Sequence, residues 1–511
     1  MESSRNRLVK NTLLLYLRTI ITLLVSLFTS RVILHSLGVD DFGLYNVIGG
    51  FVALFSVVSS SLTATTQRFL TYEIGKEKDS NVCKVFNISM SIHIYLAFIL
   101  FVLLELIGVP LLNSILNIET NRLYAANWVF QFSVFSFVIN ILSIPFTALV
   151  IANEKMNVFA YISLLSSILK LIVAYLIYVS PIDKLILYAL LLFLVALLER
   201  FIYSCYSRKS FSLIHFKLIR DRREFADIFQ FAGMNFIGAF ASILCNQGIN
   251  VLLNIFFGVV VNAARAIAVQ IQGAVERFTS DFMTALNPQI TKEYASGNIE
   301  KSISLSLLGS KFSFFLMLLM SSVFIIRTDY VLNLWLGTVP EYTVEFVRLT
   351  ICISLLNMLS NPIVTIILAN GNLRSFTFWI GGIRLLMLPA VYVALLMGGS
   401  PHTAYSIVIL FEIFALVVRM IIVNKMVGRS YFRSFLNKVL SRSIAVFFIV
   451  VSILFYIDYF FCYSFVGFIL SAITNVIISI LIILLIGITK TERTYILKLL
   501  INKFNFLNKR L

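Results

Sequence analysis

The sequence contains few charged residues for its length. Asp, Glu, Lys and Arg make up 13% of the 511 residues, whereas hydrophobic residues make up 59%. Soluble proteins carry about 25% charged residues. The mean hydropathy of +0.95 agrees with this shortage of polar surface. The composition therefore excludes a water-soluble enzyme or binding domain and indicates an integral membrane protein.

The sequence also lacks the motifs of metal, cofactor and catalytic sites. Its five cysteines lie far apart without a C-x-x-C pair, and its four histidines are equally scattered, so neither a disulfide framework nor a zinc site is predicted. The phosphate-binding pattern G-x-x-x-x-G-K-[ST] does not occur. No Ser/His/Asp or Cys/His set can be assembled from neighbouring segments. We therefore expect a protein that is not an enzyme and that uses neither a metal ion nor a cofactor.

Long apolar runs, by contrast, fill the chain. A helix needs about 20 mainly apolar residues to cross the hydrocarbon core of a membrane. On that basis we predict an all-α polytopic membrane protein with fourteen transmembrane helices, near residues 12–35, 42–66, 85–107, 126–150, 157–179, 184–205, 226–250, 256–276, 303–326, 344–368, 376–397, 403–424, 441–460 and 464–488.

Lysine and arginine are unevenly distributed between the predicted loops. With the N-terminus in the cytoplasm, the inner segments carry 29 of these residues and the outer segments carry four, namely Arg122, Lys184, Arg327 and Arg348. Cytoplasmic loops retain positive charge, so this distribution places both termini in the cytoplasm. It also accounts for the net charge of +17 without a nucleic-acid-binding patch.

Two eleven-residue segments are similar, SIPFTALVIAN at 143–153 and SNPIVTIILAN at 360–370, and they lie 217 positions apart. Two further similarities have nearly the same offset. The segments QRFLTYEIG at 67–75 and QITKEYASG at 289–297 are 222 positions apart. Gly38 and Gly258 are 220 positions apart. Chance similarity between apolar helices is the alternative explanation. The common offset favours two homologous halves of six helices each.

We accordingly divide the chain into four parts. An N-terminal six-helix lobe covers 1–205, a basic cytoplasmic linker covers 206–225 and a C-terminal six-helix lobe covers 226–424. Two extra transmembrane helices and a basic cytoplasmic tail cover 425–511. Because six is an even number, both lobes have the same orientation in the membrane. Parallel repeats of this kind usually enclose a substrate cavity at their interface.

Polar residues at helical spacing indicate which helices line this cavity. Residues three or four apart lie on one face of a helix, and the first and seventh predicted helices carry polar stripes that coincide in the repeat register. The second helix adds small and polar residues, although small residues also serve helix packing alone. The predicted polar lining consists of Thr22, Ser26, Thr29, Asn46, Asn235, Ser242, Asn246 and Asn250.

Basic residues within the predicted helices point to an anionic ligand. Each intramembrane cation costs about 2.5–3.5 kcal/mol on insertion scales, and the first and seventh helices contain no interior Asp or Glu. Arg binds phosphate oxygens through two parallel hydrogen bonds, and Lys adds a point charge, so a diphosphate would fit. Structural ion pairs or contacts with lipid headgroups are the alternative. The predicted cavity cations are Arg18, Lys170, Arg265, Arg384 and, near the outer end of the first helix, Arg31.

Other charged residues have local explanations. Glu276 lies beside Arg277, so a local ion pair is expected there. Glu412 lies on the same helix face as Arg419 and can pair with it. Lys311 and Arg419 lie near the inner boundary, where long basic side chains reach the water.

Two segments resemble a known family. TSRVILHSLGVDDFGLYNVIGG at 29–50, followed by SSSLTATTQRFLTYEIGKEKD at 59–79, resembles bacterial polysaccharide flippases of the Wzx type. These belong to the multidrug/oligosaccharidyl-lipid/polysaccharide (MOP) exporter superfamily and are relatives of the MATE drug exporters. The most recognisable features are the L-G-x-x-x-[FY]-G-x-[YF] pattern at 37–45 and the Q-R-[FY] pattern at 67–69.

The resemblance implies a function and a location. Such proteins move undecaprenyl-diphosphate-linked oligosaccharide from the cytoplasmic to the outer leaflet of the bacterial inner membrane, by alternating access between the two lobes. Cations would hold the diphosphate, and Asn and Ser would bind sugars. Membrane lipids, a polysaccharide polymerase and a chain-length regulator are the candidate partners of what we expect to be a monomer.

Two other functions remain open. A cation-drug antiporter would need intramembrane carboxylates, and a membrane enzyme or scaffold of polysaccharide assembly would act on the lipid-linked sugar or bind partners. Exchange of protons or sodium would need a titrating or coordinating group. The candidate coupling residues are Glu105, Glu412 and His93.

Overall fold

The computed structural model describes residues 2–53, 55–76, 81–115, 118, 120–181, 183–211, 222–336, 339–427, 430–489 and 492–493. Within these ranges nearly every residue is helical and none belongs to a β-strand. The side chains of Arg31 and Asn46 and half of the predicted linker, residues 212–221, lie outside what the structure describes. The described chain has the all-α membrane fold that the sequence predicts.

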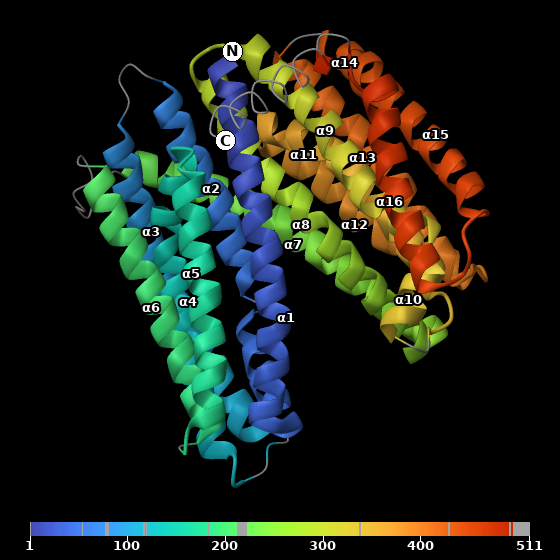
Figure 1. Ribbon diagram of the computed structural model, residues 1–511. Helices are drawn as coiled ribbons and strands as arrows, with labels where there is room; N and C mark the ends of the chain where they lie inside the picture. Colours follow the sequence, from blue (N-terminus) through green and yellow to red (C-terminus); the bar gives the residue numbers. More distant parts are fainter. Residues whose placement is uncertain are drawn as a thin grey trace, which may run out of the picture. The chain divides into compact units, whose positions relative to one another are not determined.

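The first half of the chain contributes the helices α1 to α6. Their bounds are α1 Glu2–Ala53, α2 Ser56–Gly75, α3 Val82–Pro110 with the π-helical turn η1 Leu111–Ile115, α4 Leu123–Ala152, α5 Met156–Val179 and α6 Lys184–Ser210. In Figure 1 they run from blue to green, and α3, α4, α5 and α6 form a bundle of neighbouring helices.

The second half contributes the remaining helices. They are α7 Arg222–Phe257, α8 Val259–Ala295, α9 Ile299–Ile326, α10 Thr328–Leu336, α11 Thr343–Asn370, α12 Arg374–Leu396, α13 Pro401–Val427, α14 Ser430–Phe435 with η2 Leu436–Leu440, α15 Ser441–Asp458 and α16 Phe465–Ile482 with η3 Ile483–Gly487. The last two long helices, α15 and α16, pack against α9 (Figure 1).

Eleven helices in the described part of the chain are long and apolar enough to cross a membrane. They coincide with all the predicted spans except three. The span 12–35 falls in α1, 42–66 covers the end of α1 and the first part of α2, and 256–276 covers the end of α7 and the first part of the polar helix α8. The second predicted span is not one helix, because α1 ends at Ala53 and α2 begins at Ser56. Its backbone turns at Phe55, whose N–H donates to the Val52 carbonyl three residues earlier.

The chain forms two compact units. One contains Lys10–Phe240 together with Thr291–Gly297, and we call it the N-terminal unit. The other contains Met1–Val9, Ala241–Ile290 and Asn298–Leu511, and we call it the C-terminal unit. The division therefore falls inside α7, after the predicted linker, and the last residues of α8 belong to the N-terminal unit.

The repeat seen in the sequence has a structural counterpart. Gly38 breaks α1 and Gly258 separates α7 from α8, and both glycines have a φ of +81°. The two S-x-P phrases lie at the C-terminal ends of α4 and α11, with Pro145 and Pro362 inside the helices. Helix α4 packs against α3 and α6, and α11 packs against α9 and α13. The repeated residues therefore occupy corresponding places in the two halves.

Ion pairs attach the chain's last segments to α9. At one end of that helix, Arg327 bonds Asp458 at 2.7 Å and the Phe461 carbonyl at 3.0 Å. Near the middle of the same helix, Lys311 Nζ lies 2.6 and 2.7 Å from the two carboxylate oxygens of Glu492. Lys311 is only 3% exposed, so it does not extend to water as expected. Two charged contacts, at Arg327 and Lys311, thus hold the segment after α14 against α9.

Candidate functional site

Arginine side chains gather inside the C-terminal unit. Arg265 comes from α8, Arg384 from α12 and Arg419 from α13, which also carries the carboxylate of Glu412. Arg265 lies beside the helices of the other three, because it contacts Asn246 of α7 and Tyr405 of α13, and Cys245 next to Asn246 lies 3.5 Å from Met387 of α12. These helices thus bring three guanidinium groups and one carboxylate together, and we call the four charged residues the arginine cluster.

Glu412 lies between two of the arginines. Its Oε1 is 3.1 Å from Arg384 Nη2, and its Oε2 is 3.5 Å from Arg419 Nη1. Arg419 Nη1 also donates a 2.9 Å hydrogen bond to Ser360 Oγ on α11. The side chains of Glu412 and Arg419 are almost fully buried, whereas that of Arg384 is 21% exposed. Arg384 is therefore the member of this pair of arginines that a ligand can reach.

The structure adds to one sequence expectation and overturns another. Arg384 forms an ion pair of the kind left open as the alternative, because the packing of α12 against α13 brings Glu412 to it. Arg419 does not extend to the membrane surface, because the same carboxylate and Ser360 hold it in the interior. The expected pairing of Glu412 with Arg419 is present, but Arg384 shares it.

Arg265 has a different environment from the other two arginines. Its Nη2 donates a 3.2 Å hydrogen bond to the backbone carbonyl of Asn246, and its guanidinium carbon lies 5.6 Å from the centre of the Tyr405 ring. The residue is 9% exposed, and no carboxylate of the described residues forms an ion pair with it. A carbonyl and an aromatic face stabilise the cation but do not neutralise it.

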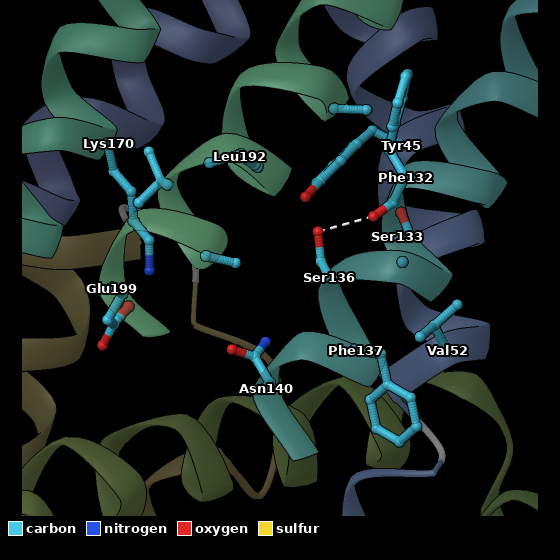
Figure 2. Close-up of a pocket in the computed structure, with 14 residues that line it drawn as sticks. Tyr45, Val52, Phe132, Ser133, Ser136, Phe137, Asn140, Lys170, Leu192 and Glu199 are labelled. Carbon is cyan, nitrogen blue, oxygen red and sulfur yellow. Dashed lines mark hydrogen bonds between the residues drawn. The ribbon is translucent and has the colours of Figure 1, made fainter. Parts of the chain in front are cut away.

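The N-terminal unit contains a polar cavity of about 300 Å³. Residues of α1, α4, α5 and α6 line it, and Lys170 on α5 is among them (Figure 2). A second cavity of about 150 Å³ shares Asn140, Ala196 and Glu199 with the first and continues it towards Tyr203. We call the two together the N-unit cavity.

Glu199, on α6, is a cavity residue that the sequence analysis missed. Figure 2 shows it on the same side of the cavity as Lys170, opposite Asn140. Its Oε2 accepts a hydrogen bond of 3.1 Å from Ser166 of α5. The sequence does contain a signal for it, because a carboxylate within an apolar span is rare and normally faces a partner or a cavity.

A second missed feature is the polar face of α4. Its members follow one another at spacings of three and four residues, which places them on one side of the helix. The hydroxyls among them donate to carbonyls of their own helix, for example Ser136 to Phe132 at 2.7 Å (Figure 2). Their oxygen lone pairs therefore remain available as acceptors. The face consists of Ser133, Ser136, Asn140, Ser143 and Thr147, all of which line the N-unit cavity.

The predicted cavity residues of α1 make mainly local contacts. The hydroxyls of Thr22, Ser26 and Thr29 donate to carbonyls of α1 itself. Arg18 bonds Thr19 at 3.4 Å and lies over the ring of Phe159 on α5, 5.0 Å from its centre. The role of Arg18 as a ligand-binding cation stays a prediction.

The predicted residues of α7 divide between the two units. Asn235 belongs to the N-terminal unit, where its Nδ2 donates to Thr65 Oγ1 at 3.2 Å. Asn246 belongs to the C-terminal unit, where it is exposed. Ser242 and Asn250 are partly buried in the same unit. Of this stripe, Asn246 contacts the arginine cluster directly, through the backbone carbonyl that accepts from Arg265.

The candidate coupling residues have different partners. His93, 1% exposed, has its Nδ1 2.7 Å from the Ser89 carbonyl. Glu105 accepts a 2.9 Å hydrogen bond from Gln131. Only Glu412 of the three belongs to the arginine cluster. No group of three or more His, Cys, Asp or Glu side chains in the described ranges could hold a metal ion.

Glu276 has partners other than the expected one. Its Oε1 accepts hydrogen bonds from Gln272 at 2.9 Å and from Ser354 of α11 at 2.5 Å. No ion pair with Arg277 is present among the described side chains. The contact with Ser354 explains the difference, because a hydroxyl from another helix meets the carboxylate.

Comparison with known proteins places the chain in a family. The sequence pattern of the family described as polysaccharide biosynthesis protein matches residues 8–293, which is more than half of the chain. The chain belongs to this family. Membership confirms, at the level of the family, the resemblance seen at 29–50 and 59–79. No curated protein sequence matches the chain.

The fold of the chain is that of MATE transporters. A MATE protein in its straight conformation superimposes with a TM-score of 0.69 at 13% identity, covering 84% of this chain and 97% of its own. An outward-facing multidrug resistance MATE transporter of the MOP superfamily gives 0.66 at 13% identity, over 83% and 96%. A MOP superfamily transporter from Pyrococcus furiosus, with a binding pocket of reversed polarity, gives 0.60 at 13% over 83% and 96%. At this identity the similarity shows the fold. Together, family and fold support a multi-pass membrane transporter.

Proposed function

We propose that the protein is a flippase. It moves undecaprenyl-diphosphate-linked oligosaccharide units from the cytoplasmic to the outer leaflet of the bacterial inner membrane, by alternating access, with both of its termini in the cytoplasm. The family supports a role in polysaccharide biosynthesis, and the MATE-like fold supports transport. The arginine cluster is the observation that carries the choice of cargo.

The arginine cluster has an excess of positive charge. Arg265, Arg384 and Arg419 contribute three charges and Glu412 compensates one of them, since its two oxygens are shared by the two nearer guanidinium groups. Charges in a medium of low dielectric constant interact strongly, and an uncompensated buried charge is costly. A ligand that carries several negative charges on a small group would remove this cost, and the diphosphate of a polyprenyl-linked sugar is such a group.

The geometry also favours a phosphate over other anions. A guanidinium group donates two parallel hydrogen bonds to phosphate oxygens. Arg384 uses Nη2 for Glu412 and remains 21% exposed, and Arg265 uses Nη2 for a carbonyl. Each therefore keeps donors with which it can bind oxygen atoms of the diphosphate, while the exposed Asn246 lies next to Arg265 and can add a further donor.

The test is to locate the lipid-linked oligosaccharide in a strain that lacks the protein. Accumulation on the cytoplasmic face of the inner membrane, relieved by the wild-type protein but not by Arg384→Ala, is expected. Unchanged delivery of the lipid-linked oligosaccharide to the outer face would reject the flippase. In that case the better-supported function would be the export of a drug or metabolite in exchange for ions, which the MATE-like fold also supports.

A further inference from the structure

The N-unit cavity offers two kinds of polar group to a ligand. Acceptors come from the α4 hydroxyls and from Glu199, whose Oε1 accepts no hydrogen bond from the described residues. Donors come from the ammonium of Lys170 and the amide of Asn140, and neither side chain is hydrogen-bonded to another described residue. Lys170 and Asn140 are also exposed. A ligand can therefore enter the cavity at these two side chains.

The charge balance of the N-unit cavity excludes two classes of ligand. A metal cation would bind the carboxylate of Glu199, but the ammonium of Lys170 lies on the same side of the cavity and repels a cation (Figure 2). A diphosphate would bind Lys170, but Glu199 repels it. The remaining fit is an uncharged ligand that has many hydrogen-bonding groups.

Size and aromatic lining narrow the choice further. The main cavity of about 300 Å³ lies at the lower limit of small-molecule sites, which measure about 300–1,000 Å³. Phe132 lines it and stacks on Trp128 with 5.5 Å between the ring centres, and Tyr45 contributes a second ring from α1 (Figure 2). Apolar ring atoms beside hydroxyl and amide groups suit a sugar ring, which has apolar C–H groups and a rim of hydroxyls.

We propose that the N-unit cavity binds one neutral sugar ring of the cargo, and that Asn140 and Lys170 determine which sugar is accepted. This assignment rests on the proposed function, because the sugar is taken to be part of the lipid-linked substrate. Asn140 donates and accepts hydrogen bonds with sugar hydroxyl or acetamido groups, Lys170 donates, and Glu199 accepts. The arginine cluster remains the site that we propose for the diphosphate.

The structure supplies a reporter for binding. The protein has three tryptophans, and Trp128 stacks on the cavity residue Phe132. In the full-length Trp335→Phe/Trp379→Phe variant, the fluorescence of Trp128 can be titrated with a free hexose, an N-acetylhexosamine, the oligosaccharide released from the cell's lipid-linked pool, inorganic diphosphate or sodium. A saturable change with a neutral sugar is expected, and none with diphosphate or sodium.

The variant Asn140→Leu tests the residue that we place at the centre of recognition. It removes hydrogen bonds to the ligand, so sugar binding should weaken about tenfold, which corresponds to about 1.4 kcal/mol. Asn113→Leu is the matched control, because Asn113 is exposed on η1 of the same unit and bonds Asn127 instead of lining the cavity. Its sugar affinity should equal that of the parent variant.

The outcomes separate this assignment from the proposed flippase. Normal flipping together with no response of Trp128 to any sugar, or with equal sugar affinity in Asn140→Leu, would overturn the assignment and leave the flippase intact. A response to sodium alone would make the cavity an ion site and overturn it as well. Saturable sugar binding in a protein that moves no lipid-linked oligosaccharide would support the cavity and reject the flippase.

Discussion

Arg384 on α12 and Glu412 on α13 form an ion pair of 3.1 Å in the interior of the C-terminal unit. The same carboxylate lies 3.5 Å from Arg419, so one negative charge serves two guanidinium groups. Glu412 therefore affects both the stability of the unit and the charge that the arginine cluster presents to an anion.

Removing this carboxylate should destabilise the protein. Glu412→Gln keeps the size of the side chain but leaves two arginines without their counter-charge, and breaking a buried ion pair costs about 3–5 kcal/mol. We expect a lower midpoint of thermal unfolding in detergent. Asp227→Asn, an equivalent change at an exposed residue of α7, is the control and should leave the midpoint in place. Equal midpoints for the two variants would contradict the shared ion pair.

Replacing the predicted cavity cations should lower transport without lowering membrane expression. A hydrogen bond to a charged group contributes about 1.5–3 kcal/mol, so Arg265→Ala and Arg384→Ala should each reduce flipping about tenfold or more. Arg18→Ala is expected to have the same direction of effect. The control is Arg374→Ala, an exposed residue at the start of α12. Full activity in all three variants would remove the cations from the mechanism.

The two glycine junctions should respond alike to alanine. A φ of +81°, combined at Gly38 with a ψ of 171°, is costly for a residue with a Cβ, by about 1–3 kcal/mol. A Cβ added at Gly38 or Gly258 would meet no atom within 4 Å, so any loss of stability comes from the backbone. Gly273→Ala, in a helical and equally open position of α8, is the control and should be neutral or stabilising. Unfolding midpoints of the three variants give the comparison.

The contact between Lys311 and Glu492 should weaken in acid. Burial raises the pKa of Glu492, but hydrogen bonds from Lys311 and the Thr489 backbone outweigh this and hold the pKa below its usual value. A carboxyl whose pKa is lowered by folding contributes stability above its unfolded pKa, about 4.3, and this contribution is lost as the pH falls through the lower folded value. Unfolding midpoints should therefore fall below about pH 4. In Glu492→Gln this part of the pH dependence should be absent.

The orientation in the membrane can be tested with the protein's own cysteine. Cys462 is exposed between α15 and α16, in a segment predicted to be extracytoplasmic. In a variant with the other four cysteines replaced by alanine, a membrane-impermeant maleimide should label Cys462 in intact spheroplasts. Ser210→Cys in a cysteine-free chain should be labelled only after the membrane is opened. The reverse pattern would invert the orientation.

The helices and the repeat can be predicted from the sequence because both depend on local signals. Apolar runs of sufficient length define the spans, and all but the spans at 42–66 and 256–276 coincide with single helices or helix segments. Gly38 and Gly258 are visible as a pair because a residue that adopts a positive φ is usually glycine. The break after Ala53 lacks such a signal, since the surrounding residues are apolar on both sides.

The partners of the charged residues could not be predicted, because they depend on how helices pack. Arg384 and Glu412 lie on the consecutive helices α12 and α13, whose short connection predicts that they are neighbours, but the sequence does not show which faces of the two helices meet. The same holds for Glu276 and Ser354. The polar face of α4 is a different case, because its spacing is visible in the sequence. Serine and threonine at such a spacing also occur where helices pack together, so the spacing alone does not indicate a cavity.

The junctions at Gly38 and Gly258 also determine where foreign sequence can be inserted. Each joins two long helical segments through a single residue, so neither junction offers a loop whose tip could accept an epitope tag or a protease site. The segment between Asp458 and Phe465 is different, because it is exposed at several residues. A tag intended to report on folding or delivery to the membrane is better placed in this segment than at either glycine junction.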